Sequence, residues 1–103
     1  MLNNKQGKID NGHDKAKVHI VLSGRVQGVA FRYYARNMAD KLGVKGWIRN
    51  LDNGDVEAVI EGKKVAVQQM VVWCKKGPSL AVVENISIDW QAYTGEFHKF
   101  NIS

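Results

Sequence analysis

The chain has 103 residues, of which 45% are hydrophobic and 24% charged, with one proline and a formal net charge of +5. This length gives room for a single core, and the composition excludes both a disordered chain and a membrane-spanning protein, because no apolar run approaches the roughly 20 residues that a bilayer requires. The basic residues are spread along the chain, so the positive charge alone does not predict a nucleic-acid surface.

Residues 1 to 16 contain almost no apolar side chains. We therefore predict a flexible polar tail there, followed by one domain over residues 17 to 103. The tail lacks the apolar segment of a signal peptide and Cys74 is the only cysteine, so we expect a protein of the reducing cytoplasm. Cys74 falls in an apolar helical pattern that predicts a buried thiol. The three histidines have no metal-ligand spacing, so we predict no metal site and no cofactor.

Apolar residues that alternate predict strands, whereas apolar residues that recur every three or four positions predict helices. In chain order, the predicted elements are a strand at residues 18 to 23, a helix at 31 to 42, strands at 44 to 51 and 56 to 61, a helix at 64 to 76, and strands at 83 to 90 and 97 to 102. Asn53-Gly54 between the second and third strands is a strong hairpin signal. This order predicts an α+β fold, a ferredoxin-like sandwich (βαββαβ) with two helices packed on one face of a mainly antiparallel sheet.

The three tryptophans fall within these predicted elements. They are Trp47, Trp73 and Trp90. Tryptophans in regular elements most often pack against a core, so we predict packing rather than ligand stacking for each.

Residues 24 to 32, here called the 24–32 segment, join the first strand to the first helix and contain Gly24, Gly28 and Arg32. The first N–H groups of a helix lack partners within the helix and lie at the positive end of its dipole, so an anion is stabilised there. Glycine lets backbone amides approach a ligand, and an arginine supplies a planar, bidentate positive charge. On its own the segment fits an ordinary turn with a solvated arginine better than an anion site, because two glycines four residues apart occur in many turns. It is not a Walker A loop, because no Lys-Ser or Lys-Thr follows Gly28.

Asn50 is a second polar candidate, at the end of the strand predicted for residues 44 to 51. Strand alternation puts Asn50 on the same face as Ile48 and Gly46, opposite Arg49. From this segment alone, Asn50 could also be only a turn residue before the hairpin.

Several motifs in a fixed order connect these two candidates. In chain order they are G-x-V-Q-G-V-x-F-R at residues 24 to 32, L-G-V-x-G-W-I-R-N at 42 to 50, N-G-x-V-E at 53 to 57, E-G at 61 to 62, Trp73, G-P at 77 to 78 and G-x-F-x-x-F-x-I at 95 to 102. Over residues 17 to 103 this pattern closely resembles the acylphosphatase family. Two departures stand within it: Ala30 occupies a position that varies in the family, and Leu51 stands where many members have threonine.

The resemblance implies a site and an activity. Arg32 would grip a phosphoryl group, and Asn50 would orient an attacking water. The activity implied is metal-independent hydrolysis of the carboxyl-phosphate bond of small-molecule acyl phosphates, with inorganic phosphate as product and inhibitor. We expect a monomer that binds neither nucleic acid nor membrane. The backbone N–H groups that would hold the phosphoryl oxygens are those of Val26, Gln27, Gly28, Val29, Ala30, Phe31 and Arg32.

Two other functions remain open at this point. One is a non-catalytic module that binds acyl phosphate or carbamoyl phosphate, because acylphosphatase-like domains also occur in larger proteins of hydrogenase maturation. The other is an RNA-binding sheet on the same scaffold, which would need exposed aromatics on central strands where the first strand offers Val, His, Ile, Val and Leu.

Overall fold

The computed structural model describes residues 14 to 103. Residues 1 to 13 of the predicted tail lie outside the described residues, and Lys15 and Ala16, also assigned to the tail, belong to the first described strand. The elements are β2 (Lys15–Arg25), α2 (Phe31–Leu42), β3 (Lys45–Asn50), β4 (Val56–Lys63), α3 (Lys64–Lys76), β5 (Val82–Gln91) and β6 (Phe100–Ile102).

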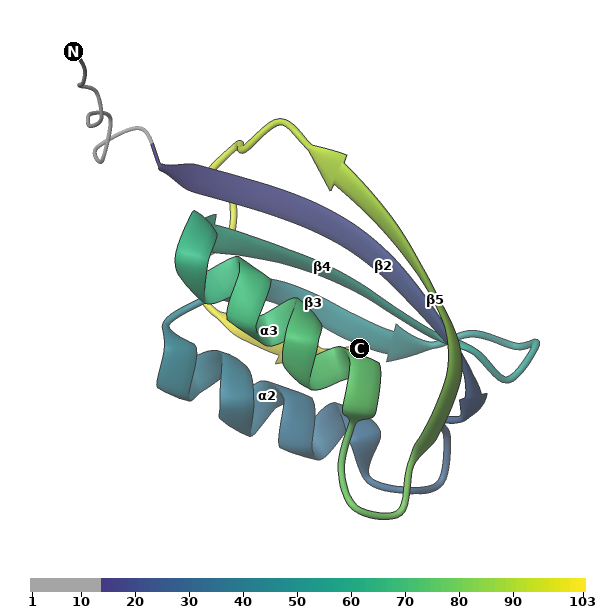
Figure 1. Ribbon diagram of the computed structural model, residues 1–103. Coiled ribbons are helices and arrows are strands. Elements are labelled where there is room, and N and C mark those ends of the chain that lie inside the picture. Colours follow the sequence, from purple (N-terminus) through teal and green to yellow (C-terminus); the bar gives the residue numbers. More distant parts are fainter. Residues whose placement is uncertain (1–13) are drawn as a thin grey trace, which may run out of the picture.

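The strands form one five-stranded sheet in the order β5-β2-β4-β3-β6. Its pairs are antiparallel except for β3 and β6, which run parallel. Both helices lie on the same side of the sheet, as Figure 1 shows. The α+β fold with two helices on one face of a mainly antiparallel sheet is therefore confirmed.

The core lies between the helices and the sheet. Alternate residues of the central strands point into it, among them Val18, Ile20 and Leu22 of β2, which are all fully buried. Cys74 on α3 is also fully buried, as predicted, and burial raises the pKa of its thiol to about 12. Desolvation disfavours the thiolate, so this cysteine is an unreactive part of the core.

The helices begin and end at the predicted residues, and the strands differ more. α2 ends at Gly43, whose left-handed conformation lets its N–H bond to carbonyls of the last turn. β2 is longer at both ends than predicted, because its register with β4 and β5 continues past the apolar alternation. β6 begins at Phe100 rather than at residue 97.

The packing prediction for tryptophan is confirmed for Trp73 and wrong for Trp90. Trp73 packs against the core cluster, whereas Trp90 is 48% exposed. Trp90 pairs with the buried Val18 of β2. However, β5 is an edge strand of the sheet, so no strand lies along its other side to cover Trp90.

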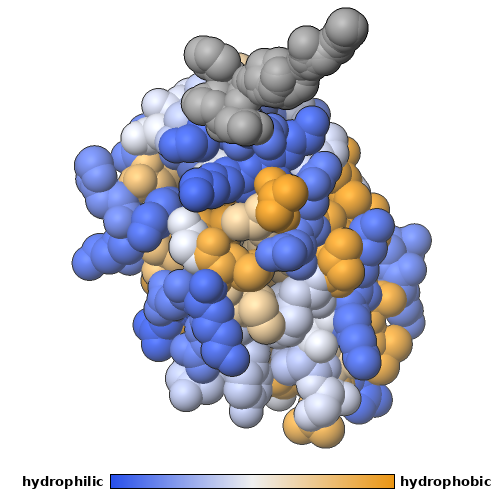
Figure 2. All heavy atoms as spheres, turned by 60° about the vertical axis from the view of Figure 1, so that its left-hand side comes forward, coloured by the Kyte–Doolittle hydropathy of each residue, from blue (hydrophilic) through white to orange (hydrophobic). Residues whose placement is uncertain are grey.

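The surface mixes polar and apolar residues. On the face shown in Figure 2, hydrophobic residues gather in several separate patches among hydrophilic ones. Within residues 14 to 103, no helix has the length and hydropathy needed to cross a membrane.

Candidate functional site

The connection between β2 and α2, residues 26 to 30, has the backbone of an anion-binding loop. Gly28 and Ala30 have left-handed φ angles of 75° and 62°, while Val29 between them does not have a positive φ. Such alternation turns successive N–H groups toward one point and forms a concave nest for an anion. Among the described residues, no backbone carbonyl accepts a hydrogen bond from the N–H groups of residues 26 to 32. These donors are therefore free of backbone partners.

Ala30 is the non-glycine residue with a positive φ in the described part of the chain, and it directly precedes α2. A left-handed conformation costs an L-residue about 1 kcal/mol or more. Because Ala30 directly precedes the first turn of α2, its backbone conformation sets how the chain enters the helix.

A small cavity of about 220 Å³ opens at this loop. It brings together the two candidate side chains, Arg32 from the first turn of α2 and Asn50 from the end of β3. The cavity is lined by Val26, Gln27, Gly28, Ala30, Phe31, Arg32, Tyr33, Asn50 and Ile102. Six of the seven predicted amide residues are in this set. Val29 is not, because it packs against the core cluster.

The Arg32 side chain has a hydrogen-bond partner that was not predicted from the sequence. Its Nη1 donates a hydrogen bond to the backbone oxygen of Ser103, 3.0 Å away, just past the end of β6. The guanidinium has further donors on Nε and Nη2, so this bond fixes its plane while other N–H groups remain for a ligand. Ser103 and the cavity-lining Ile102 were not predicted as part of the site, since only the parallel pairing of β6 with β3 brings them there.

Phe31 anchors the end of the loop in the core. Its ring packs edge-on against Trp73 of α3, with centroids 5.5 Å apart. A Cβ on Gly77 would lie 2.6 Å from the Phe31 ring, so glycine is required there for the ring to fit. The aromatic residue of the motif therefore has a packing role in addition to the role predicted for its backbone N–H.

Gly24 has a different role from the one its place in the motif indicates. It lies within β2, at a register shift between Ser23 and Gly24, and is not among the residues that line the cavity. With φ at 118°, a Cβ on Gly24 would lie 2.3 Å from the carbonyl oxygen of Val82 on β5. Gly24 is therefore needed for the close approach of two strands at a bulge rather than for contact with an anion.

The side chain of Gln27 connects the loop to the hairpin that follows Asn50. Its Nε2 donates to the backbone oxygens of Leu51 and Asp55, each at 2.8 Å. Sequence reasoning assigned only the backbone of Gln27 to the site. Leu51, a departure from the family pattern, takes part in this contact through its backbone, so its side chain is not what the contact requires.

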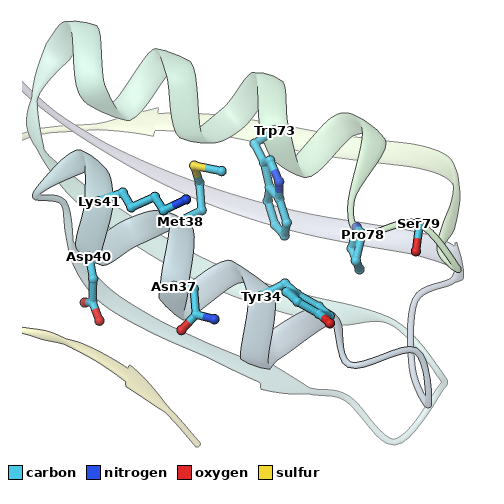
Figure 3. Close-up of a pocket in the computed structure, with 8 residues that line it drawn as sticks. All are labelled: Tyr34, Asn37, Met38, Asp40, Lys41, Trp73, Pro78 and Ser79. Carbon is cyan, nitrogen blue, oxygen red and sulfur yellow. The ribbon is translucent and has the colours of Figure 1, made fainter.

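A larger recess, of about 650 Å³, lies between α2 and α3. In Figure 3, Trp73 extends from α3 toward α2, while Asn37 and Asp40 point away from α3. This recess shares no lining residue with the cavity at the 24–32 segment. It carries one acidic and one basic side chain and no helix N-terminus, so it lacks the concentration of N–H donors that an anion site needs.

On the sheet face opposite the helices, Glu57 accepts hydrogen bonds from His19 Nε2 at 2.7 Å and from Arg49 Nε at 2.6 Å. These bonds, first that of His19 and then that of Arg49, lower the pKa of Glu57 below its ordinary value of 4.5. The three residues link β2, β4 and β3 and are not among those that line the cavity. Within residues 14 to 103, no group of three or more His, Cys, Asp or Glu residues is placed to hold a metal ion.

Comparison with known proteins agrees with the sequence motifs. The acylphosphatase family model matches residues 18–102. The chain is 55% identical to an acylphosphatase of Roseiflexus sp. (strain RS-1) over 89 residues. This match covers 86% of this chain and 96% of the relative. The structure of this chain is similar to that of an acylphosphatase from Bacillus subtilis, with a TM-score of 0.82 and 38% sequence identity. The match covers 85% of this chain and 98% of the other. A structure of an acylphosphatase from Coxiella burnetii has a TM-score of 0.84 and 30% identity, over 93% and 100% of the two chains. The chain therefore belongs to the acylphosphatase family.

Proposed function

We propose that the cavity formed by the 24–32 segment, Arg32 and Asn50 is the site at which this member of the acylphosphatase family hydrolyses acyl phosphates. The observation that supports this most strongly is the set of N–H groups of residues 26 to 32 that have no backbone acceptor among the described residues. All of these residues except Val29 line one cavity, together with the Arg32 guanidinium and the Asn50 side-chain amide.

The first step of the proposal is binding of the phosphoryl group. Its oxygens accept hydrogen bonds from the loop N–H groups at the positive end of α2, where the helix dipole favours an anion. Arg32 adds charge-assisted bonds whose direction is set by its contact with Ser103. These donors are fixed before the substrate arrives, so they stabilise charge on the equatorial oxygens in the transition state without reorganising.

The second step is departure of the carboxylate. Carboxylic acids have pKa values near 4 to 5, so the leaving group departs at neutral pH as an anion and needs no general acid. This explains how a site with one guanidinium, one side-chain amide and backbone donors is sufficient for catalysis.

The third step is attack by water. The Asn50 side-chain amide orients the water in line with the bond that breaks, and a phosphoryl oxygen of the substrate accepts the water's proton. The acid-base groups His19 and Glu57 are bonded to each other on the opposite face of the sheet, so they do not supply the base. A pH-rate profile that shifts on mutation of His19 would contradict a substrate base.

Steady-state hydrolysis of benzoyl phosphate by the isolated chain tests this function. We expect many turnovers per protein, no loss of rate on addition of a chelator, and competitive inhibition by inorganic phosphate. We further propose that the protein acts as a monomer in the cytoplasm, and a rate per chain that is independent of protein concentration agrees with a monomer. Tight binding of acyl phosphate without turnover would instead support the non-catalytic binding module.

A further inference from the structure

We propose that Gln27 is a positioning residue, whose side chain fixes the position of Asn50 relative to the 24–32 segment. This inference rests on the proposed function, because it assumes that Asn50 orients the attacking water. It assigns to the Gln27 side chain a role separate from that of its backbone N–H.

The amide of Gln27 is matched to two carbonyls of the hairpin turn. Both of its bonds, to Leu51 O and Asp55 O, are 2.8 Å long, and one –NH₂ group has the two hydrogens that they need. Leu51 is covalently attached to Asn50. A single side chain therefore connects residue 27 of the loop to the backbone of the residue that follows Asn50.

The turn is already closed without Gln27. Leu51 N donates to Asp55 O at 2.8 Å, Gly54 N donates to Leu51 O at 3.1 Å, and Asp55 N donates to Asn53 Oδ1 at 2.9 Å. The bonds from Gln27 therefore add little to the internal shape of the turn. What they fix is the position of the turn relative to the loop.

The position of Asn50 needs such a connection. Asn50 is the last residue of β3 and is exposed, and its pairing with Val56 is the last step of the β3–β4 register. Strand ends fray more readily than strand centres, and a catalytic group displaced by about 1 Å can lose on the order of 100-fold in rate. A connection at the next residue limits this displacement.

A double-mutant cycle tests the proposal. Gln27→Met removes both hydrogen bonds while keeping the length of the side chain, and Asn50→Ala provides the second background. We expect Gln27→Met to lower kcat for benzoyl phosphate about tenfold in the wild-type background and less than about twofold when Asn50 is alanine. Inhibition by inorganic phosphate should change less than about threefold, because the backbone donors remain.

The matched control is Asn53→Ala. It removes the two hydrogen bonds of the Asn53 side chain with Asp55 in the same turn and leaves the connection to the loop intact. This variant should lose stability, as measured by urea unfolding, while kcat stays within about twofold of wild type. If Gln27→Met does not fold, Gln27→Asn carries the same test, because its amide ends one methylene short of the two carbonyls.

Three results are decisive. An equal loss of kcat from the Gln27 variant in both backgrounds, or a loss from Asn53→Ala as large as that from Gln27→Met, would overturn the positioning role and leave the proposed function standing. Wild-type kcat in Asn50→Ala alone would overturn the role of Asn50, and the positioning role with it.

Discussion

Replacing Arg32 with lysine keeps the positive charge and removes the planar fork of donors. In the structure Nη1 is engaged with Ser103 O at 3.0 Å, while the rest of the guanidinium borders the cavity. An ammonium is a single donor centre, so it cannot occupy both positions. Hydrogen bonds to charged groups contribute about 1.5–3 kcal/mol each. Loss of one such bond together with a misplaced charge costs about 3 kcal/mol in the transition state, or about 100-fold in kcat.

The assay is steady-state hydrolysis of benzoyl phosphate by wild type, Arg32→Lys and Arg32→Ala. We expect both variants to lose about 100-fold or more in kcat, with lysine little better than alanine. The free energy of unfolding should change by less than about 1 kcal/mol, because the bond to Ser103 is exposed. Arg36→Lys, one turn further along α2 and not lining the cavity, serves as the control and should keep wild-type activity. Turnover by Arg32→Lys within about threefold of wild type would refute the reasoning.

Four further predictions concern Asn50, Glu57, Cys74 and Gly24. Asn50→Ala should lower kcat on the order of 100-fold with little change in KM, and a raised KM at unchanged kcat would make Asn50 a binding residue instead. Because the pKa of Glu57 is lowered in the folded protein, its stabilising effect is complete above pH 4.5 and is lost as pH falls through the lowered pKa. The stability difference between wild type and Glu57→Gln in urea unfolding should therefore be largest at neutral pH and shrink toward pH 3. With its thiol pKa raised to about 12, Cys74 should resist alkylation at pH 8 until the protein unfolds, and rapid labelling of the native state would contradict its burial. Gly24→Ala should destabilise the protein by about 3 kcal/mol, because its Cβ would lie 2.3 Å from the Val82 oxygen, and unchanged unfolding by urea would show that the bulge does not require glycine.

The helices were predictable because their signals are local. The apolar spacing of residues 31 to 42 and 64 to 76, with glycine directly after each, defines α2 and α3 to the residue. The association of the 24–32 segment with Asn50 was predictable only through the resemblance to the acylphosphatase family, because each segment alone could also be an ordinary turn.

The remaining features depend on neighbours that are distant in sequence. The requirement for glycine at residue 24 comes from the backbone of β5, and the exposure of Trp90 comes from the edge position of that strand. Ser103 reaches Arg32 only through the parallel pairing of β6. The bonds of the Gln27 side chain depend on where the hairpin lies in three dimensions, so the sequence offers only the presence of a glutamine there.

The most direct test of the proposed phosphate site is a titration of the ¹⁵N-labelled protein with inorganic phosphate, in which binding is monitored by amide chemical shifts. The proposed site predicts saturable shifts concentrated at residues 26 to 32 and at Asn50, with the same dissociation constant as competitive inhibition. Shifts concentrated instead at the recess between α2 and α3, around Tyr34 and Trp73, with none in the 24–32 segment, would contradict it.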